Sequence, residues 1–221
     1  MRSDECKKEI IKIIRSMSGR HSVYDVFNDW VTCFAISISN STDLIHNELW
    51  HAREQQYLDI VKKYEKDQQL KFAELSAYLV EALTSKIDDA LGDIYMRLDV
   101  SNKNAGQFFT PYSISRLAAK LAIDEKKLDE GFLMNEPSVG AGGMVIAAVD
   151  IILNDYNKNP QMLMRVACND LDWRCVYMTY VQLSLLGIKA VVYQGDTLKE
   201  PYPTSEANVF RTPTEKGLLL V

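Results

Sequence analysis

Residues 131–144 read GFLMNEPSVGAGGM, and this stretch decides the fold. Its apolar start ends in Glu136 and Pro137, a glycine-rich turn follows, and residues 145–153 are apolar on nearly every side. This order is typical of a buried strand, a tight turn and a buried helix, the unit that opens a doubly wound sheet. Glycine suits such a turn because it permits positive φ and leaves no Cβ between the backbone and a ligand. The stretch therefore predicts an α/β fold with a ligand at the turn.

The residues after the glycines narrow the class of ligand. A phosphate-binding P-loop needs a Lys-Ser/Thr pair after its last glycine, whereas Met144 and Val145 follow Gly143 here. The spacing also departs from the Gly-x-Gly-x-x-Gly of nicotinamide enzymes, so an oxidoreductase is disfavoured, although dinucleotide binding stays open. The acid and proline before the glycines favour S-adenosylmethionine. A plain glycine turn that only packs a helix on a sheet is the remaining alternative.

A second and a third predicted strand also end near carboxylates. Residues 162–168 and 189–194 are largely apolar, with the sequence NDLD directly after the first and Asp196 shortly after the second. The carboxyl ends of parallel strands share one edge of a sheet, and ligands of doubly wound folds bind beyond that edge. We therefore expect Glu136, Asp170 and Asp196 to lie together there.

The two acids of the NDLD sequence have different expected roles. An acid at the end of the second strand is where a doubly wound site holds ribose hydroxyls, which favours Asp170 as a ligand residue. Asp172 precedes a helix that Gly187 ends, so its rival interpretation is the N-cap of that helix.

The first hundred residues predict an all-α bundle. Apolar residues recur there at helical spacing in five segments, at residues 4–17, 23–38, 46–65, 68–83 and 88–96. Short connections between such segments are typical of helical bundles. We therefore expect an α-helical N-terminal domain over residues 1–100 and a partial S-adenosylmethionine-binding domain over residues 101–221.

An uncharged stretch joins the two parts. Residues 104–112 read NAGQFFTPY, and Ser113 is the expected N-cap of a helix that ends at Ala122. Because the stretch comes about 25 residues before the glycine turn, we expect it to fold over the same edge of the sheet.

Composition describes a soluble globular protein with ample core. The 221 residues are 47% hydrophobic with a net charge of −5, and neither half has the basic surplus that autonomous DNA binding requires. No signal peptide is visible, and no apolar run is long enough to span a bilayer.

Cysteine and histidine residues predict neither disulfides nor a metal site. The four cysteines show no Cys-x-x-Cys spacing, which favours buried free thiols in a reducing cytoplasm. His21, His46 and His51 have no acid or cysteine at ligand spacing, so we expect no metal.

Four motifs together resemble the N6-adenine DNA methyltransferase family, particularly the modification subunit of type I restriction–modification systems. They are GQFFTP at 106–111, EPSVGAGG at 136–143, NDLD at 169–172 and GDTL at 195–198. Their order and spacing match that family from about residue 88 to residue 198. The resemblance implies a helical domain before a Rossmann-like methyltransferase domain. It also implies transfer of a methyl group from S-adenosylmethionine to N6 of an adenine that is flipped out of DNA.

The resemblance also implies which residues bind the cofactor. They are Phe109, Thr110, Pro111, Glu136, Gly140, Gly142, Asp170 and Asp196. The first three would flank its methionine part, and the next three would line its backbone side. The last two acids would take the ribose hydroxyls and the exocyclic amine of the adenine ring, respectively.

One departure from the family concerns catalysis. The catalytic motif of the family is Asn or Asp, then Pro-Pro, then an aromatic residue, after the fourth strand. No two of the six prolines here are adjacent, and Asn159-Pro160 precedes the second strand, so no catalytic residue is assigned. The chain is then expected to be either a truncated member of the family or a cofactor-binding or regulatory subunit of a modification complex. A methyltransferase for another substrate is a further alternative.

The resemblance implies macromolecular partners. We expect contact with DNA within a complex, and a specificity subunit or a second methylase subunit as a partner chain. Separately, the apolar surface and negative balance of the first hundred residues predict self-association through the helical domain. No membrane partner is expected.

Overall fold

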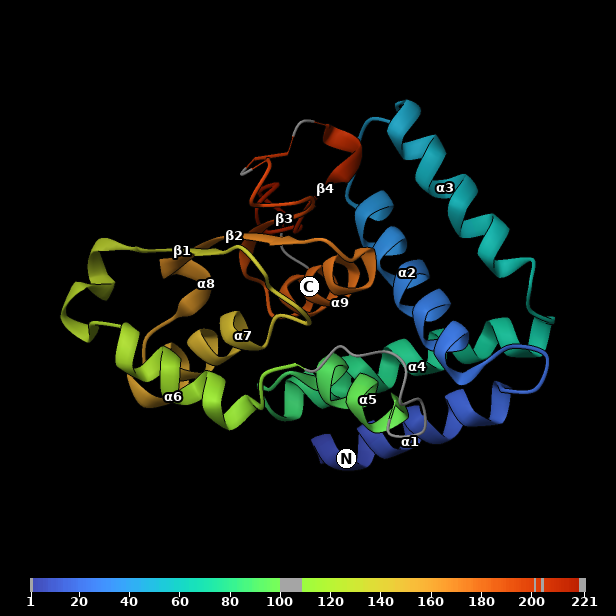
Figure 1. The fold of residues 1–221 in the computed structure, drawn as a ribbon, viewed down its shortest axis with the longest axis horizontal. Coiled ribbons are helices and arrows are strands. Elements are labelled where there is room, and N and C mark those ends of the chain that lie inside the picture. The colour runs from blue at the N-terminus through green and yellow to red at the C-terminus, as the bar shows by residue number, and fades with distance from the viewer. Residues whose placement is uncertain (1, 100–108, 201, 204, 219–221) are drawn as a thin grey trace.

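The computed structural model describes residues 2–99, 109–200, 202–203 and 205–218. A group of helices lies beside a small sheet that carries its own helices (Figure 1). The N-terminal helices are α1 (Ser3–Met17), α2 (Val23–Ser41), α3 (Glu48–Val61), α4 (Lys66–Ser85) and α5 (Ala90–Asp99). The predicted fold class, a helical N-terminal region followed by an abbreviated α/β sheet, is confirmed. No helix of the described residues is long and apolar enough to cross a membrane.

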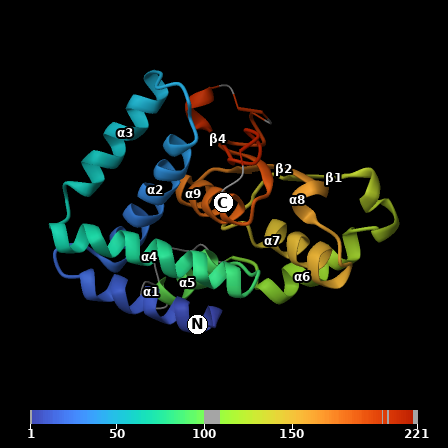
Figure 2. The same ribbon diagram turned by 180° about the vertical axis from the view of Figure 1, so that it is seen from behind.

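Helix α2 shows how the sequence sets these elements. The Ser22 hydroxyl accepts from the Asp25 backbone N–H at 3.0 Å, while the Asp25 carboxylate accepts from the Ser22 backbone N–H at 3.2 Å. This capping box satisfies N–H groups that lack partners at a helix start. The apolar face of α2, with Phe27 and Trp30 almost wholly buried, packs toward the sheet helices. Figure 2 shows α1, α4 and α5 side by side beneath α2 and α9 (Trp173–Leu185), and α4 and α5 contact α9 as well.

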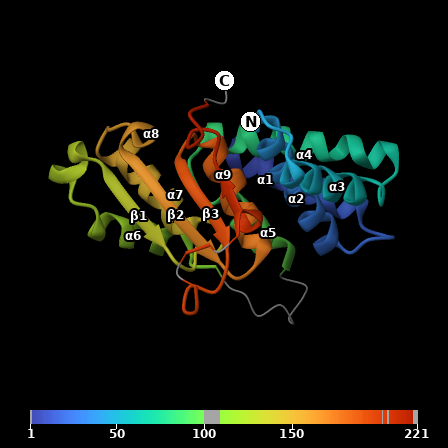
Figure 3. The ribbon, with the colours of Figure 1, turned by 90° about the horizontal axis from the view of Figure 1, so that it is seen from above.

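Within the described residues, the sheet has four strands in the order β1-β2-β3-β4. Strands β1 (Phe132–Glu136), β2 (Met164–Asp170) and β3 (Lys189–Gln194) are parallel, and β4 (Val209–Arg211) is antiparallel to β3 (Figure 3). The register pairs Glu136 with Cys168 and Asp170 with Gln194. The three parallel strands therefore end at one edge, as the sequence predicted.

The crossover helices cover a single face of this sheet. Helix α7 (Gly143–Asp150) runs on into a π-helical turn, Ile151–Asp155, and α9 (Trp173–Leu185) joins β2 to β3. In Figure 3 both α7 and α9 lie behind the strands. The strand order advances in one direction, so right-handed crossovers place both helices on the same side. Leu133 on β1 is 82% exposed, so the described helices do not cover the opposite face as a fully doubly wound sheet would.

Three local predictions were wrong. Helix α6 (Tyr112–Ala122) begins before Ser113, since the Pro111 carbonyl already accepts from the Ile114 and Ser115 N–H groups at 2.8 and 3.1 Å. The second strand starts at Met164 because residues 160–163 form a short helix, α8 (Pro160–Leu163), which Asn159 caps. Strand β4 lies in a segment where the sequence predicted no element.

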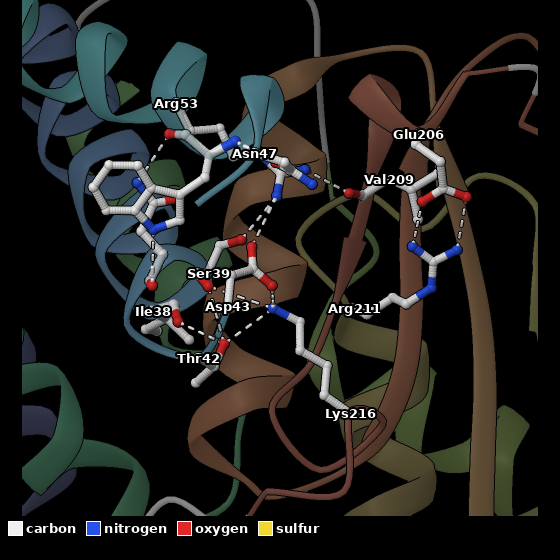
Figure 4. A network of polar contacts seen from close by, with 12 residues as sticks. Ile38, Ser39, Thr42, Asp43, Asn47, Arg53, Glu206, Val209, Arg211 and Lys216 are labelled. Atoms are coloured by element: carbon white, nitrogen blue, oxygen red, sulfur yellow. Dashed lines mark hydrogen bonds and ion pairs between the residues drawn. The ribbon is translucent and has the colours of Figure 1, made fainter. Parts of the chain in front are cut away.

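The helical part and the sheet share one hydrophobic core. A single cluster of buried side chains includes Trp30 of α2, Ile94 of α5, Val181 of α9 and Val192 of β3. Polar contacts also join the two parts, as Figure 4 shows for α2 and α3 against β4. There the buried Arg53 side chain donates to the Val209 carbonyl at 2.7 Å and to the Ser39 hydroxyl at 2.9 Å.

Candidate functional site

The glycine turn between β1 and α7 contains two residues with left-handed backbone conformation. Gly140 has φ +57° and Gly142 has φ +100°, conformations that side chains with a Cβ rarely adopt. The Gly140 N–H donates to the Asp170 carboxylate at 2.9 Å, and its carbonyl accepts from the Thr179 hydroxyl at 2.9 Å. The turn is therefore fixed to the end of β2 and to α9, which places it directly beside Asp170.

Asp170 and Asp172 have the different environments that the sequence indicated. The second oxygen of Asp170 accepts from the Asp172 N–H at 2.9 Å, so each carboxylate oxygen holds one backbone donor. A carboxylate offers about four acceptor positions, which leaves Asp170 free to accept more. Asp172 accepts from the Arg174 N–H at 2.9 Å and pairs with its guanidinium, so it is the N-cap of α9. The capping interpretation of Asp172 is confirmed.

A cavity of about 220 Å³ opens beside this turn. Of the eight residues expected to bind a cofactor, Phe109, Thr110, Gly140 and Asp170 line it. Pro111 instead lines a neighbouring cavity of about 500 Å³, to which Phe109 and Thr110 also contribute. The other half of the uncharged stretch, residues 104–108, lies outside the described residues.

Glu136, Gly142 and Asp196 do not line the 220 Å³ cavity. Glu136 ends β1 and accepts weakly from the Ser138 N–H at 3.4 Å. Asp196 pairs with Lys199 at 3.2 Å, and the hydrogen bond from Lys199 lowers the pKa of the Asp196 carboxyl. The strand ends thus bring the three predicted acids to one edge, but only Asp170 reaches this cavity.

Two polar residues that the sequence did not single out hold the strand ends together. The Thr197 hydroxyl donates to the Pro137 carbonyl at 2.9 Å and also contacts the side chain of the buried Asn169. The backbone carbonyl of Asn169 in turn accepts from the Val139 N–H at 2.9 Å. Asn169 lies in the NDLD motif and Thr197 in the GDTL motif. Each is therefore next to a predicted acid, and this position in the sequence could have identified it as part of the site.

Asp89 is a further acid at the site, and it comes from the helical part of the chain. It is 7% exposed and precedes α5, yet it lines both cavities. One carboxylate oxygen accepts from the Gly92 N–H at 2.9 Å and from the Gln182 side-chain amide at 3.0 Å. The same amide donates to the Ala141 carbonyl at 2.8 Å, which connects Asp89 to the glycine turn. Burial raises the pKa of the Asp89 carboxyl.

Ser115 of α6 lines the same small cavity. Its side chain is fully buried, and its hydroxyl has no hydrogen-bond partner in the described part of the chain. A Cβ built on Gly143 would lie 3.7 Å from this hydroxyl and 3.1 Å from the second Asp89 oxygen. The absence of a side chain at Gly143 therefore keeps both polar groups open to the cavity.

The remaining reactive side chains give no sign of other chemistry. The four cysteines are buried, and burial raises the pKa of Cys168 and of Cys175, which disfavours thiolates. His46 stacks on Trp50 with ring centroids 4.0 Å apart, and His21 packs on Tyr64 at 4.6 Å. Among the described residues, no three His, Cys, Asp or Glu side chains are grouped to hold a metal.

Comparisons with known proteins identify a matching family and similar folds. The family model described as N-6 DNA Methylase matches residues 86–211, more than half of the chain. The chain is similar in fold to a crystal structure of a type I restriction–modification system methyltransferase subunit from Streptococcus thermophilus, with 15% identity and a TM-score of 0.50. That match covers 93% of this chain and 61% of the subunit, so the chain spans less than two thirds of the subunit's length.

A putative class I S-adenosylmethionine-dependent methyltransferase from Listeria monocytogenes also matches. The identity is 13%, the TM-score is 0.47, and the match covers 85% of this chain and 52% of that one. Among curated proteins, none matches this chain.

Proposed function

The chain belongs to the N-6 DNA methylase family, and we propose that it binds S-adenosylmethionine beside the glycine turn as part of a DNA adenine-N6 methyltransferase. S-adenosylmethionine is the methyl donor that family membership implies. The observation that carries the proposal is the juxtaposition of the turn and Asp170, joined by the 2.9 Å hydrogen bond from the Gly140 N–H. It sets a carboxylate with remaining acceptor positions beside the glycine backbone of the turn.

The chemistry of the residues present fits this cofactor. A Cβ on Gly140 would stand 3.0 Å from the Phe109 ring, so glycine at this position lets the ring pack directly against the turn at the edge of the cavity. The cavity also presents carboxylates and the unpartnered Ser115 hydroxyl, which suit a ligand rich in hydroxyl, ammonium and carboxylate groups. Its 220 Å³ is below the roughly 300–1,000 Å³ of sites for whole ligands, so it suits one end of the cofactor.

Each predicted residue is assigned to one part of the cofactor. Asp170 accepts from the ribose hydroxyls through its remaining lone pairs, and Asp196 accepts from the adenine amine at the end of β3. Phe109, Thr110 and Pro111 flank the methionine part. Glu136, Gly140 and Gly142 border the cofactor from the end of β1 and the turn.

When bound, S-adenosylmethionine supplies an electrophilic methyl group, and adenine in DNA is the proposed acceptor. The Asn/Asp-Pro-Pro-aromatic motif that would hold the flipped base is not among these 221 residues, so the cofactor half of the reaction is the part assigned here to named residues. The proposed partners are DNA and a specificity or second methylase subunit, in a complex in the cytoplasm.

Titration calorimetry tests the proposal. We expect the wild-type chain to bind S-adenosylmethionine and its demethylated product, and not NAD. The substitution Asp170→Asn should weaken both by roughly ten-fold or more, because the ribose loses a charge-assisted acceptor.

Asp172→Ala is the matched control for Asp170. It should lower the free energy of unfolding by about 1 kcal/mol through loss of the helix cap and leave affinity nearly intact. Tight binding of NAD with no heat from either methionine-derived ligand would overturn the assignment of the cofactor. The reverse pattern of effects at positions 170 and 172 would show that the two carboxylates are assigned the wrong way round.

A further inference from the structure

We propose that Asp89 and Ser115 bind the amino-acid end of the cofactor: the Asp89 carboxylate accepts from its ammonium group, and the Ser115 hydroxyl donates to its carboxylate. This inference rests on the proposed function, and it assigns part of the cofactor site to the helical part of the chain.

The first support is the placement of the two side chains. Both line the 220 Å³ cavity together with Thr110, Gly140 and Asp170. One Asp89 oxygen and the Ser115 hydroxyl each lie within 4 Å of the position that a Cβ on Gly143 would take. A ligand group above Gly143 would therefore have a carboxylate and a hydroxyl within reach at once.

The second support is the charge of Asp89. Its neighbour Asp88 has a cationic partner in Lys7, with a nitrogen–oxygen distance of 2.8 Å, and Lys7 also pairs with Asp93 at 3.0 Å. Within the described residues the Asp89 carboxylate forms no ion pair; it accepts hydrogen bonds only from the Gly92 N–H and the Gln182 amide. A buried carboxylate without a cation is costly, and a ligand ammonium would supply the missing charge.

The third support is the orphaned hydroxyl of Ser115. Buried polar groups almost always have hydrogen-bond partners, so an unpartnered one facing a cavity calls for an explanation. The first turn of α7, at Gly143 and Met144, borders the same cavity. N–H groups there have no partner within the helix, and the positive end of a helix favours a carboxylate. An acceptor for the ammonium, the Asp89 carboxylate, and donors for the carboxylate, the Ser115 hydroxyl and the first N–H groups of α7, thus border the same cavity.

The hydrogen bonds of Asp89 hold this arrangement in register with the turn. The Gln182 side chain accepts from the Leu91 N–H at 3.0 Å and donates to both Asp89 and the Ala141 carbonyl. The start of α5 and the glycine turn are therefore fixed to the same amide group. This fixes the distance between the ammonium acceptor and the ribose acceptor, Asp170.

The test compares two ligands that differ in the amino-acid end. S-adenosylhomocysteine carries this end, and 5′-methylthioadenosine lacks it while keeping the adenosine and the sulfur. By titration calorimetry, Asp89→Asn and Ser115→Ala should each weaken S-adenosylhomocysteine by roughly ten-fold, through the loss of a charged or charge-assisted hydrogen bond. Both variants should bind 5′-methylthioadenosine within about two-fold of wild type.

Two control variants stand outside the cavity. Asp150→Asn changes another buried carboxylate, and Ser184→Ala changes another buried serine hydroxyl; neither residue lines the cavity. Both should leave the ratio of the two affinities unchanged. Ser115→Ala removes only an unpartnered hydroxyl, so it keeps the test valid if Asp89→Asn disturbs folding.

The outcomes separate this inference from the proposed function. No binding of S-adenosylhomocysteine by wild type would overturn the function itself. Wild-type binding with unchanged affinity in both variants would overturn the inference alone. Equal weakening of both ligands by Asp89→Asn would also overturn it, because Asp89 would then act only by supporting the turn.

Discussion

At the scale of single residues, the Asp89 carboxyl accepts hydrogen bonds from Gly92 and Gln182, but its burial disfavours the charged form. Burial raises the pKa of its carboxyl above the ordinary value of 3.8, with the negative charge of Asp88 adding to the rise. Hydrogen bonds from Gln182 and Gly92 and the charge of Lys7 act in the opposite direction without cancelling the rise. Folding therefore favours the protonated form of this carboxyl relative to the unfolded chain.

This preference predicts how stability depends on pH. A group whose pKa is raised on folding contributes stability that is fully present below the unfolded value and is lost as pH rises through the folded value. We expect Asp89→Asn, which keeps the acceptor oxygen for Gly92 and Gln182, to raise the free energy of unfolding at pH 7 relative to wild type. Urea unfolding at pH 7 and near pH 4 should show this gain shrink as the solution becomes more acidic.

Asp150→Asn is again the contrast for the pH experiment. Asp150 is buried but pairs with Arg116 and accepts from the Tyr112 hydroxyl at 3.1 Å. Removal of its charge should destabilise the chain at pH 7, opposite in sign to Asp89→Asn. A loss of stability at pH 7 in Asp89→Asn would mean that the charge itself supports the fold.

At the scale of elements, the sequence was most informative where one local signal decides the structure. The third strand was predicted at residues 189–194, where β3 lies, because an apolar run there follows Gly187. Strand β4 was missed because it has three residues and is defined by pairing with β3, not by its own pattern. The sequence placed the start of α6 at Ser113 because serine is a common N-cap. In the structure the N-cap is Pro111, whose backbone carbonyl accepts the first hydrogen bonds of the helix.

The candidate site shows the same limit. Asp170 and the glycine turn lie in neighbouring motifs, so the sequence could place them together. Asp89 and Gln182 are 93 positions apart and contact only because α5 packs on α9. No spacing rule connects such residues, and a buried serine without a partner can be recognised only from the folded chain.

The contact between α3 and β4 gives a prediction at this scale. Arg53 is buried, donates to Ser39 and Val209, and lies 4.1 Å from the centroid of the Phe210 ring. We expect Arg53→Ala to lower the free energy of unfolding by about 2–4 kcal/mol, because buried acceptors lose a charged donor and its packing. Chemical denaturation measures this loss.

The control is another arginine of the same region. Arg211 pairs with Glu206 at the surface, with side-chain exposures of 41% and 69% (Figure 4). Exposed pairs of this kind contribute about 0–1 kcal/mol, so Arg211→Ala should change stability far less. Equal effects of the two substitutions would show that Arg53 is not a structural anchor of β4.

At the scale of the whole molecule, the division into a helical domain over residues 1–100 and a cofactor-binding domain over residues 101–221 stays a prediction. The sequence separates an all-α segment from a sheet segment, and the composition of each is consistent with a domain. Yet the hydrophobic cluster is continuous from α1 through α9 to β3, and the proposed cofactor site takes Asp89 from the first segment. We expect the two segments to depend on each other for stability.

Hydrogen exchange can test this dependence on the intact chain. If the shared core makes the molecule one cooperative unit, the slowest amides of α2 and of β3 should exchange through the same global opening, with the same free energy. Both values should also match the free energy of unfolding from denaturation, and Arg53→Ala should lower both equally because it joins α3 to β4. The cofactor should raise protection in both segments together, since a ligand that binds only the folded state stabilises whatever must form its site. Lower protection in α2 than in β3, unchanged by the cofactor, would show that the helical segment opens alone and that Asp89 is not needed to hold the ligand.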